Sequence, residues 1–169
     1  YAERLCGFGD TPEGAIPSCT THLNVVDREG NVVALTQTLL SLFGSKVVLP
    51  DTGILMNNGM MWFDPIPGRA NSIAPGKRPL SNMCPVIICD PAGCRTAIGA
   101  SGGRRIMSAV LQILSFMVDC QMTVHDAMRQ PRIDVSGGTD ITIDTLLDPD
   151  IVEYLSRHHS VIAVPHGVY

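Results

Sequence analysis

The sequence has few of the features that characterise nucleic-acid-binding and membrane proteins. Only 5% of its 169 residues are aromatic, 17% are charged, and the formal net charge is −4. It contains no run of basic residues, so we exclude nucleic acid as a partner. The longest apolar segment, residues 110–118, is interrupted by Gln112 and Ser115 and is too short to span a bilayer. We expect a soluble protein without a membrane span, in a compartment that the sequence leaves open, cytoplasmic or periplasmic.

The sequence also lacks the patterns of metal and cofactor sites. Its six cysteines do not have the short paired spacings of a zinc site, and His158, His159 and His166 have no acidic or cysteine residue at ligand spacing. We therefore expect neither a metal ion nor a cofactor. Cys89 and Cys94 flank the turn Asp90-Pro91-Ala92-Gly93. Their thiols could form a disulfide across a hairpin or stay reduced as small apolar side chains.

With 45% hydrophobic residues, a chain of this length can bury one substantial core. Strand runs followed by helical periods predict a layered α+β domain. The helix predicted at residues 103–117 is apolar on most faces, which favours burial inside a layer. Strands are predicted at residues 54–56, 83–89, 95–100, 132–135, 141–143 and 161–164, and helices at 103–117, 123–130 and 148–158.

A predicted β-hairpin organises the first part of this domain. Thr20 to Asp27 and Val32 to Thr38 are rich in strand-forming residues, and the segment 28–31 between them contains glycine and asparagine. Such a hairpin brings the threonine that ends its second strand beside the threonine that begins its first.

A threonine hydroxyl is a poor nucleophile at neutral pH and needs a base within hydrogen-bond reach. If the backbone is cut between Cys19 and Thr20, the freed α-amine, with a pKa of roughly 7.7 to 8.0, supplies that base on the same residue. Hydroxyls that only pair across a polar hairpin are the alternative interpretation of the threonines taken alone.

A second segment that could take part in a reaction is Gly99-Ala100-Ser101-Gly102-Gly103-Arg104-Arg105. It lies between a predicted strand and the long predicted helix. Backbone N–H groups at a helix start have no intrahelical partner, and the helix dipole is positive there, so the loop can stabilise an anion. It matches neither standard nucleotide-binding fingerprint. By itself it also fits a tight strand-to-helix turn.

Several motifs resemble one protein family in the same order. They are Thr20-Thr21-His22, Asp27-x-x-Gly30-Asn31, Thr36-x-Thr38, Phe43-Gly44, Gly53-Ile54-Leu55-Met56-Asn57-Asn58, Lys77-Arg78-Pro79-Leu80-Ser81 and Gly102-Gly103-x-Arg105-Ile106. Over about residues 20–165 they resemble the small subunit of the gamma-glutamyltransferase family of N-terminal nucleophile hydrolases. The resemblance implies an α+β fold, a four-layer αββα sandwich, that matures by self-cleavage just before a nucleophilic threonine.

This resemblance implies how the chain is divided. Thr20 matches the nucleophile, so Cys19 and Thr20 flank the bond that is cleaved. Residues 1–19 then form the tail of the large-subunit region, and residues 20–169 form the small-subunit catalytic region.

The resemblance also assigns roles to further residues. Thr38 resembles the family threonine whose hydroxyl bonds the nucleophile, and Gly102 and Gly103 resemble the glycine pair of the oxyanion hole. Ser81 and Asn82 stand where the family has two serines that bind the substrate's α-carboxylate; the asparagine departs from the pattern but remains a donor. Without the family, both would be ordinary turn residues.

Three positions depart from the family in a consistent way. Where the family holds the substrate's α-ammonium with an asparagine, a glutamine and an aspartate, this chain has Leu40, Gly59 and Trp62. A buried ammonium without acceptors is costly, so a γ-glutamyl donor should bind poorly. The segment 63–77 is shorter than the family's lid, which implies an open pocket. Both departures resemble the cephalosporin-acylase-like branch, and Trp62 would line an apolar wall or simply pack in the core.

The implied function is that of a self-processing threonine hydrolase or acyltransferase, which cleaves γ-glutamyl or glutaryl-type amides through an acyl-enzyme. Its implied partner is the large subunit of the same precursor. Two alternatives stay open. One is true γ-glutamyl transfer, with the ammonium held by groups of the large subunit. The other is a non-catalytic fragment that acts as a structural or partner-binding module.

Overall fold

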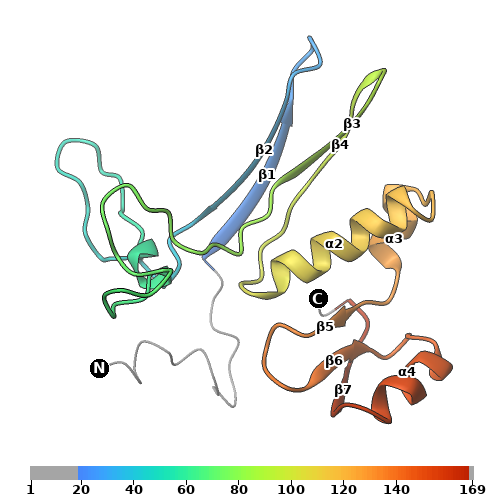
Figure 1. The fold of residues 1–169 in the computed structure, drawn as a ribbon. Helices are drawn as coiled ribbons and strands as arrows, with labels where there is room; N and C mark the ends of the chain where they lie inside the picture. The colour runs from blue at the N-terminus through green and yellow to red at the C-terminus, as the bar shows by residue number, and fades with distance from the viewer. Residues whose placement is uncertain (1–18, 168–169) are drawn as a thin grey trace.

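A computed structural model describes residues 19–167, with the backbone alone at positions 94 and 95. Residues 1–18, predicted as the tail of a preceding subunit, lie outside the described residues. The described chain is a mixed α+β structure with two β-hairpins side by side, a long helix beneath the second, and a small three-stranded sheet with its own helix (Figure 1).

The first hairpin agrees with the sequence prediction. Strands β1 (Thr20–Val26) and β2 (Val32–Thr38) pair antiparallel, with Thr20 opposite Thr38. The Asp27 carboxylate closes the turn by accepting bonds from the backbone N–H and the side-chain amide of Asn31, at 2.8 and 2.7 Å. These bonds lower the pKa of Asp27, and the bond from the Asn31 side chain has the largest effect.

The second hairpin consists of β3 (Val86–Asp90) and β4 (Gly93–Ile98), which reverse at the predicted turn and place Cys89 opposite Cys94. Helix α2 (Arg105–Val118) packs on it, followed by the short helix α3 (Val124–Arg129). Thr123 caps α3 by accepting a bond from Asp126 N–H. The buried core of this region comprises Ile98, Ile106, Val110, Ile113 and Ala127.

The third sheet has the order β5 (Ile133–Asp134), β6 (Ile141–Asp144) and β7 (Val161–Val164). Strands β6 and β7 are parallel, so the chain crosses between them through helix α4 (Pro149–Ser156). The predicted strand at residues 132–135 forms over two residues only.

Two sequence predictions are wrong for the described chain. Residues 54–56 form no strand: Leu55 makes an isolated bridge with Val48, in a segment held by loop hydrogen bonds that leads into the 3-10 helix η1 (Gly59–Trp62). Helix α2 is not buried on most faces, because Met107 and Leu111 are 54% and 67% exposed. Within residues 19–167 the second hairpin, α3 and β5 cover parts of this helix and leave the face with Met107 and Leu111 open.

The two hairpins are joined by polar and close backbone contacts. The Asn24 side chain, on β1, donates to the carbonyl oxygen of Ala97 on β4, at 3.0 Å. The ring of His22 lies directly against Gly99, so closely that a Cβ there would fall 2.2 Å from a ring carbon. The same ring contacts Thr36 Oγ1 at 2.8 Å and Asn24 Oδ1 at 2.9 Å. His22 therefore fills the space between the first hairpin and the segment after β4.

A buried carboxylate anchors the third sheet. Asp144, only 3% exposed, accepts a bond from Leu146 N–H and lies 2.7 Å from His166 Nδ1. Burial raises the pKa of Asp144, but the hydrogen bonds from Leu146 and His166, with the charges of His166 and Arg132, outweigh burial and lower it. No acidic residue lies near His166 in the sequence, but the fold places Asp144 beside it, from a strand 22 residues earlier.

We predict that Gly99→Ala destabilises the protein by about 1 to 3 kcal/mol, because the new methyl group overlaps the His22 ring. In a His22→Ala background the same change should cost much less, since the space is then free. Thermal or urea unfolding of the full-length protein measures this double-mutant cycle. Gly137→Ala is the matched control because nothing lies within 4 Å of a Cβ there. Equal costs in both backgrounds would contradict the contact.

We predict that Asp144→Asn lowers the free energy of unfolding by about 1 to 3 kcal/mol at pH 7. The pKa of Asp144 is lowered in the folded state. Its stabilising effect is therefore present above the unfolded-state pKa of about 3.9 and is lost as the pH falls through the folded value. Urea unfolding of the full-length protein between pH 7 and 3 should show the gap between wild type and variant narrowing below about pH 4. A constant gap would refute this account.

Candidate active site

The candidate site begins with two threonine hydroxyls at the open end of the first hairpin. Thr20 starts β1 and Thr38 ends β2, directly opposite each other, and Thr20 Oγ1 donates to Thr38 Oγ1 at 3.0 Å. Thr38 Oγ1 also accepts from Leu40 N–H at 2.9 Å, where Leu40 has a positive φ of 72°. The sharp turn after β2 thus fixes the second hydroxyl, which in turn orients the first.

The glycine pair lies at the start of α2. Gly102 and Gly103 have φ angles of 141° and 63°, which glycine adopts without strain. Their carbonyl oxygens accept from Arg105 and Ile106 N–H, both at 3.3 Å. Within residues 19–167 no hydrogen bond uses the N–H group of either glycine. Two exposed backbone donors therefore stand at the positive end of a helix, where an anion is stabilised.

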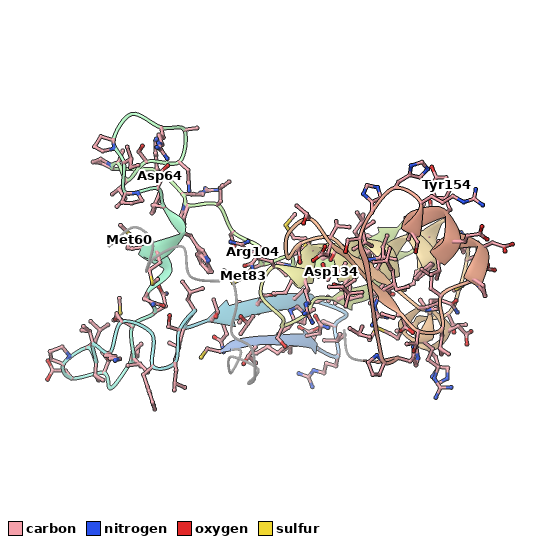
Figure 2. The ribbon with its side chains drawn as sticks, turned by 90° about the horizontal axis from the view of Figure 1, so that it is seen from below. Met60, Asp64, Met83, Arg104, Asp134 and Tyr154 are labelled. Carbon is pink, nitrogen blue, oxygen red and sulfur yellow. The ribbon has the colours of Figure 1, made fainter. Side chains whose placement is uncertain are left out.

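His22 connects the strand that begins with Thr20 to the first residue of the glycine loop. His22 is two residues after Thr20 on β1, so both side chains lie on the same face of the strand. Its ring touches Gly99, the residue that opens the glycine loop. Figures 1 and 2 both place this loop beside the end of the hairpin where β1 starts. The His22 ring thus packs against backbone and bonds the side chains of Thr36 and Asn24.

The predicted substrate-binding residues come from the long connection between the hairpins. Ser81 is exposed, and its Oγ accepts from Met83 N–H at 3.2 Å; Asn82 is half-buried. In Figures 1 and 2 the end of this connection, which carries Met83, passes close to the start of α2, which carries Arg104. Trp62 is half-buried in η1.

The side chains of Asn58 and Asn71 organise this connection, and neither was predicted from the sequence to do so. Asn58 bonds Ser41 through its side chain, accepting from N–H at 3.1 Å and donating to Oγ at 2.8 Å. Asn71 donates to the Trp62 carbonyl at 2.6 Å and accepts from Leu80 N–H at 3.3 Å. Neither role has a local sequence signal, because each bond joins segments 9 or 17 residues apart.

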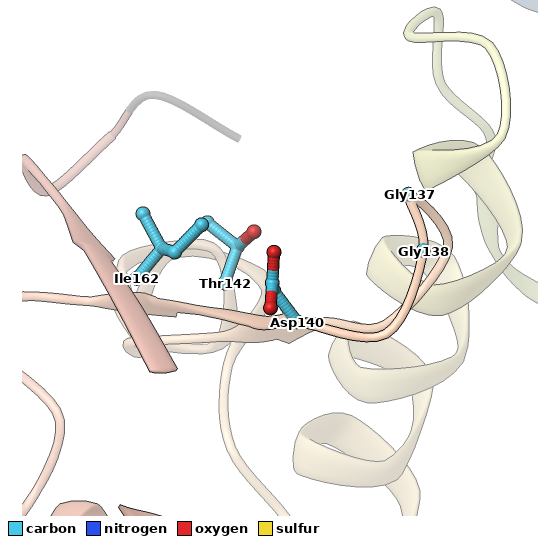
Figure 3. A pocket seen from close by; sticks show the side chains of 5 residues that line it. All are labelled: Gly137, Gly138, Asp140, Thr142 and Ile162. Carbon is cyan, nitrogen blue, oxygen red and sulfur yellow. The ribbon is translucent and has the colours of Figure 1, made fainter. Parts of the chain in front are cut away.

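The described residues meet neither the requirements of a metal site nor those of a membrane-spanning helix. Among residues 19–167 no group of three or more histidine, cysteine or acidic residues could hold a metal ion. No described helix has the length and apolar character needed to cross a membrane. A pocket of about 160 Å³ lies along the third sheet, lined by Gly137, Gly138, Asp140, Thr142 and Ile162 (Figure 3). It contains neither threonine of the pair.

Comparison with known proteins agrees with this geometry. The family model for gamma-glutamyltranspeptidase matches residues 9–167. The chain is 38% identical to the acylase ACY 1 proenzyme of Pseudomonas sp. (strain SE83) and 35% identical to the glutathione hydrolase proenzyme of Bacillus subtilis (strain 168). These matches cover 86% and 87% of this chain but 26% and 25% of the relatives, so the chain spans about a quarter of their length.

A solved structure gives the same result at the level of the fold. The Helicobacter pylori gamma-glutamyltranspeptidase T380A mutant superposes with a TM-score of 0.72 at 31% identity, and the match covers 86% of each chain. Its fold is that of the N-terminal nucleophile hydrolases, with mixed helix and strand content. By sequence and by fold, the chain therefore belongs to the gamma-glutamyltranspeptidase family.

Proposed function

We propose that this chain is the small-subunit part of a self-processing threonine hydrolase or acyltransferase, with Thr20 as its nucleophile. The observation that carries the proposal is the 3.0 Å hydrogen bond between the hydroxyls of Thr20 and Thr38, at the first residue after the proposed cleavage point. Residues 1–19 are then the end of the large-subunit region, and residues 20–169 the catalytic region.

The proposed maturation step is an attack by Thr20 Oγ1 on the carbonyl carbon of Cys19. The peptide C–N bond breaks, the acyl group moves to the oxygen as an ester, and the nitrogen takes up the hydroxyl proton. Water then hydrolyses the ester and leaves the free α-amine of Thr20. Thr38 Oγ1, which accepts the hydrogen bond of the nucleophile, holds the attacking oxygen in place.

In the proposed catalytic cycle the freed amine acts as the base. It takes the proton of Thr20 Oγ1 as this oxygen attacks the amide carbonyl of the donor, and it returns a proton to the leaving amine. The N–H groups of Gly102 and Gly103 stabilise the negative oxygen of the tetrahedral intermediate. Water, or an acceptor amine, then attacks the acyl ester and regenerates the hydroxyl.

The proposed donor has an acyl chain that ends in a carboxylate and lacks an α-ammonium. Ser81 and Asn82 supply donors for that carboxylate. Leu40, Gly59 and Trp62 offer no side-chain acceptor for an ammonium, which favours a glutaryl-type over a γ-glutamyl donor. The second candidate is γ-glutamyl transfer, with the ammonium of the donor held by the large subunit. It is supported by the B. subtilis relative, which is named a glutathione hydrolase.

We propose that the large subunit of the same precursor completes the four-layer αββα sandwich around this chain. The first hairpin leaves apolar side chains uncovered: Val25 and Val33 are each 52% exposed, and Leu35 is 44% exposed. A contiguous apolar surface of this kind needs a covering layer. The relatives are named proenzymes, which favours an enzyme over a non-catalytic fragment.

We predict that Thr20→Ala in the full-length protein abolishes both processing and turnover, with a loss of at least about 10³-fold in rate. N-terminal mass analysis measures the processing, and an anilide hydrolysis assay measures the turnover. Thr21→Ala is the matched control, because Thr21 is exposed on the neighbouring position of the same strand and should leave both reactions intact. A new N-terminus at position 20 in the Thr20→Ala variant would contradict the proposed mechanism.

We predict that the mature protein prefers a glutaryl anilide to a γ-glutamyl anilide, because only the second needs an ammonium site. Trp62→Asp should shift the ratio of the two kcat/KM values toward the γ-glutamyl donor by about tenfold or more, since a carboxylate is restored beside the ammonium. Trp62→Phe is the control that keeps the site apolar. An unchanged ratio in the aspartate variant would place the specificity elsewhere.

A further inference from the structure

A polar face of α2 is bonded to strand β5 by side chains. Arg105, Ser108 and Gln112 are three and four residues apart and lie on one face of the helix. The Gln112 amide makes two bonds with the backbone of Ile133, accepting from its N–H at 2.9 Å and donating to its carbonyl oxygen at 2.8 Å. The helix and the strand are therefore joined in a fixed register.

The centre of this contact is the carboxylate of Asp134, which is 4% exposed. Asp134 Oδ1 accepts from Ser108 Oγ at 3.0 Å and from Ser136 N–H at 3.2 Å. Its second oxygen lies 3.6 Å from Arg105 Nε. A carboxylate that is almost fully buried requires such partners, and this one is hydrogen-bonded to Ser108 and paired with the charge of Arg105.

The charges at the start of α2 explain why a carboxylate is needed there. Arg104 precedes the helix without a capping side-chain bond, Arg105 begins it, and no acidic residue lies in the first turn. The positive end of the helix dipole disfavours two cations in this place. Asp134 supplies the missing negative charge from another element, in contact with Arg105.

Arg105 links this carboxylate to the glycine pair. Its side chain pairs with Asp134, while its backbone N–H bonds the carbonyl of Gly102 at 3.3 Å. The two glycines have positive φ angles and no side chains, so their own conformation does little to fix where their N–H groups point. The direction of those donors depends on the residues that hold the first turn of α2.

We propose that Asp134 is a positioning residue for the reaction at Thr20. By fixing Arg105 and Ser108 it holds the first turn of α2, and with it the Gly102 and Gly103 N–H groups, in the direction of the developing oxyanion. The inference rests on the proposed function. Asp134 touches neither the substrate nor the reacting atoms; it acts through the helix start.

The test compares Asp134→Asn and Arg105→Gln in the full-length, fully processed protein, with whichever of the two anilide donors the wild type cleaves faster. Positioning predicts that each variant lowers kcat about tenfold and changes KM less than about twofold. The double variant should lose little more than either single variant, because both break one contact. A purely electrostatic role would move the two kcat values in opposite directions, because one variant removes a negative and the other a positive charge.

Ser108→Ala provides a milder variant that keeps the buried carboxylate and its charge, and it should lower kcat by a smaller factor. Asp140→Asn is the control, because Asp140 is an exposed carboxylate near the start of β6, and it should leave kcat unchanged. Unfolding midpoints report whether any variant is simply less folded.

The possible outcomes separate this inference from the proposed function. An active wild type with unchanged kcat in Asp134→Asn and in Ser108→Ala overturns the positioning role alone, as do opposite effects of the aspartate and arginine variants. A loss of kcat that follows a loss of folded protein also overturns it. An inactive wild type, or an active Thr20→Ala variant, overturns the proposed function and this inference with it.

Discussion

The register of one hairpin determines whether the candidate site exists. Thr20 and Thr38 meet only because β1 and β2 pair with these two residues opposite each other. A slip of one residue would turn every side chain of one strand to the other face and separate the hydroxyls. The turn at the far end fixes the register through the two bonds between Asp27 and Asn31. Because the pKa of Asp27 is lowered, that acceptor stays ionised well below neutral pH.

The glycine loop is fixed relative to this hairpin from two sides. On one side, His22 and Asn24 contact Gly99 and Ala97. On the other, α2 is bonded through its polar face to β5. Apart from the packing of His22 on Gly99, these contacts are directional hydrogen bonds, whereas apolar burial gives stability without fixing direction. An oxyanion site needs donors at defined angles, so polar contacts suit this purpose better than a larger core would.

The sequence predicts the elements whose signals are local. The strand pattern and the turn predicted the first hairpin, and the helical period of residues 103–117 predicted α2. It could not predict the contacts of Asp144 with His166 or of Asp134 with Ser108, because these pairs are 22 and 26 residues apart and carry no spacing rule. The exposed face of α2 was also misjudged, since an apolar pattern does not tell which face has a neighbour within the chain.

The segment that departs from the family contacts the threonine pair through the backbone of Leu40, whose N–H donates to Thr38 Oγ1 at 2.9 Å, and not through the Leu40 side chain. Leu40, Gly59 and Trp62 belong to the long connection after β2, which is held at its base by Asn58 and in its middle by Asn71. These anchors are bonds to Ser41, Trp62 and Leu80, and none of them involves Thr20 or the glycine pair. Side chains in the connection can therefore change what the site accepts without moving the nucleophile. In the proposed enzyme, the exchange of a γ-glutamyl for a glutaryl-type donor thus requires no change in the hairpin register or in the start of α2.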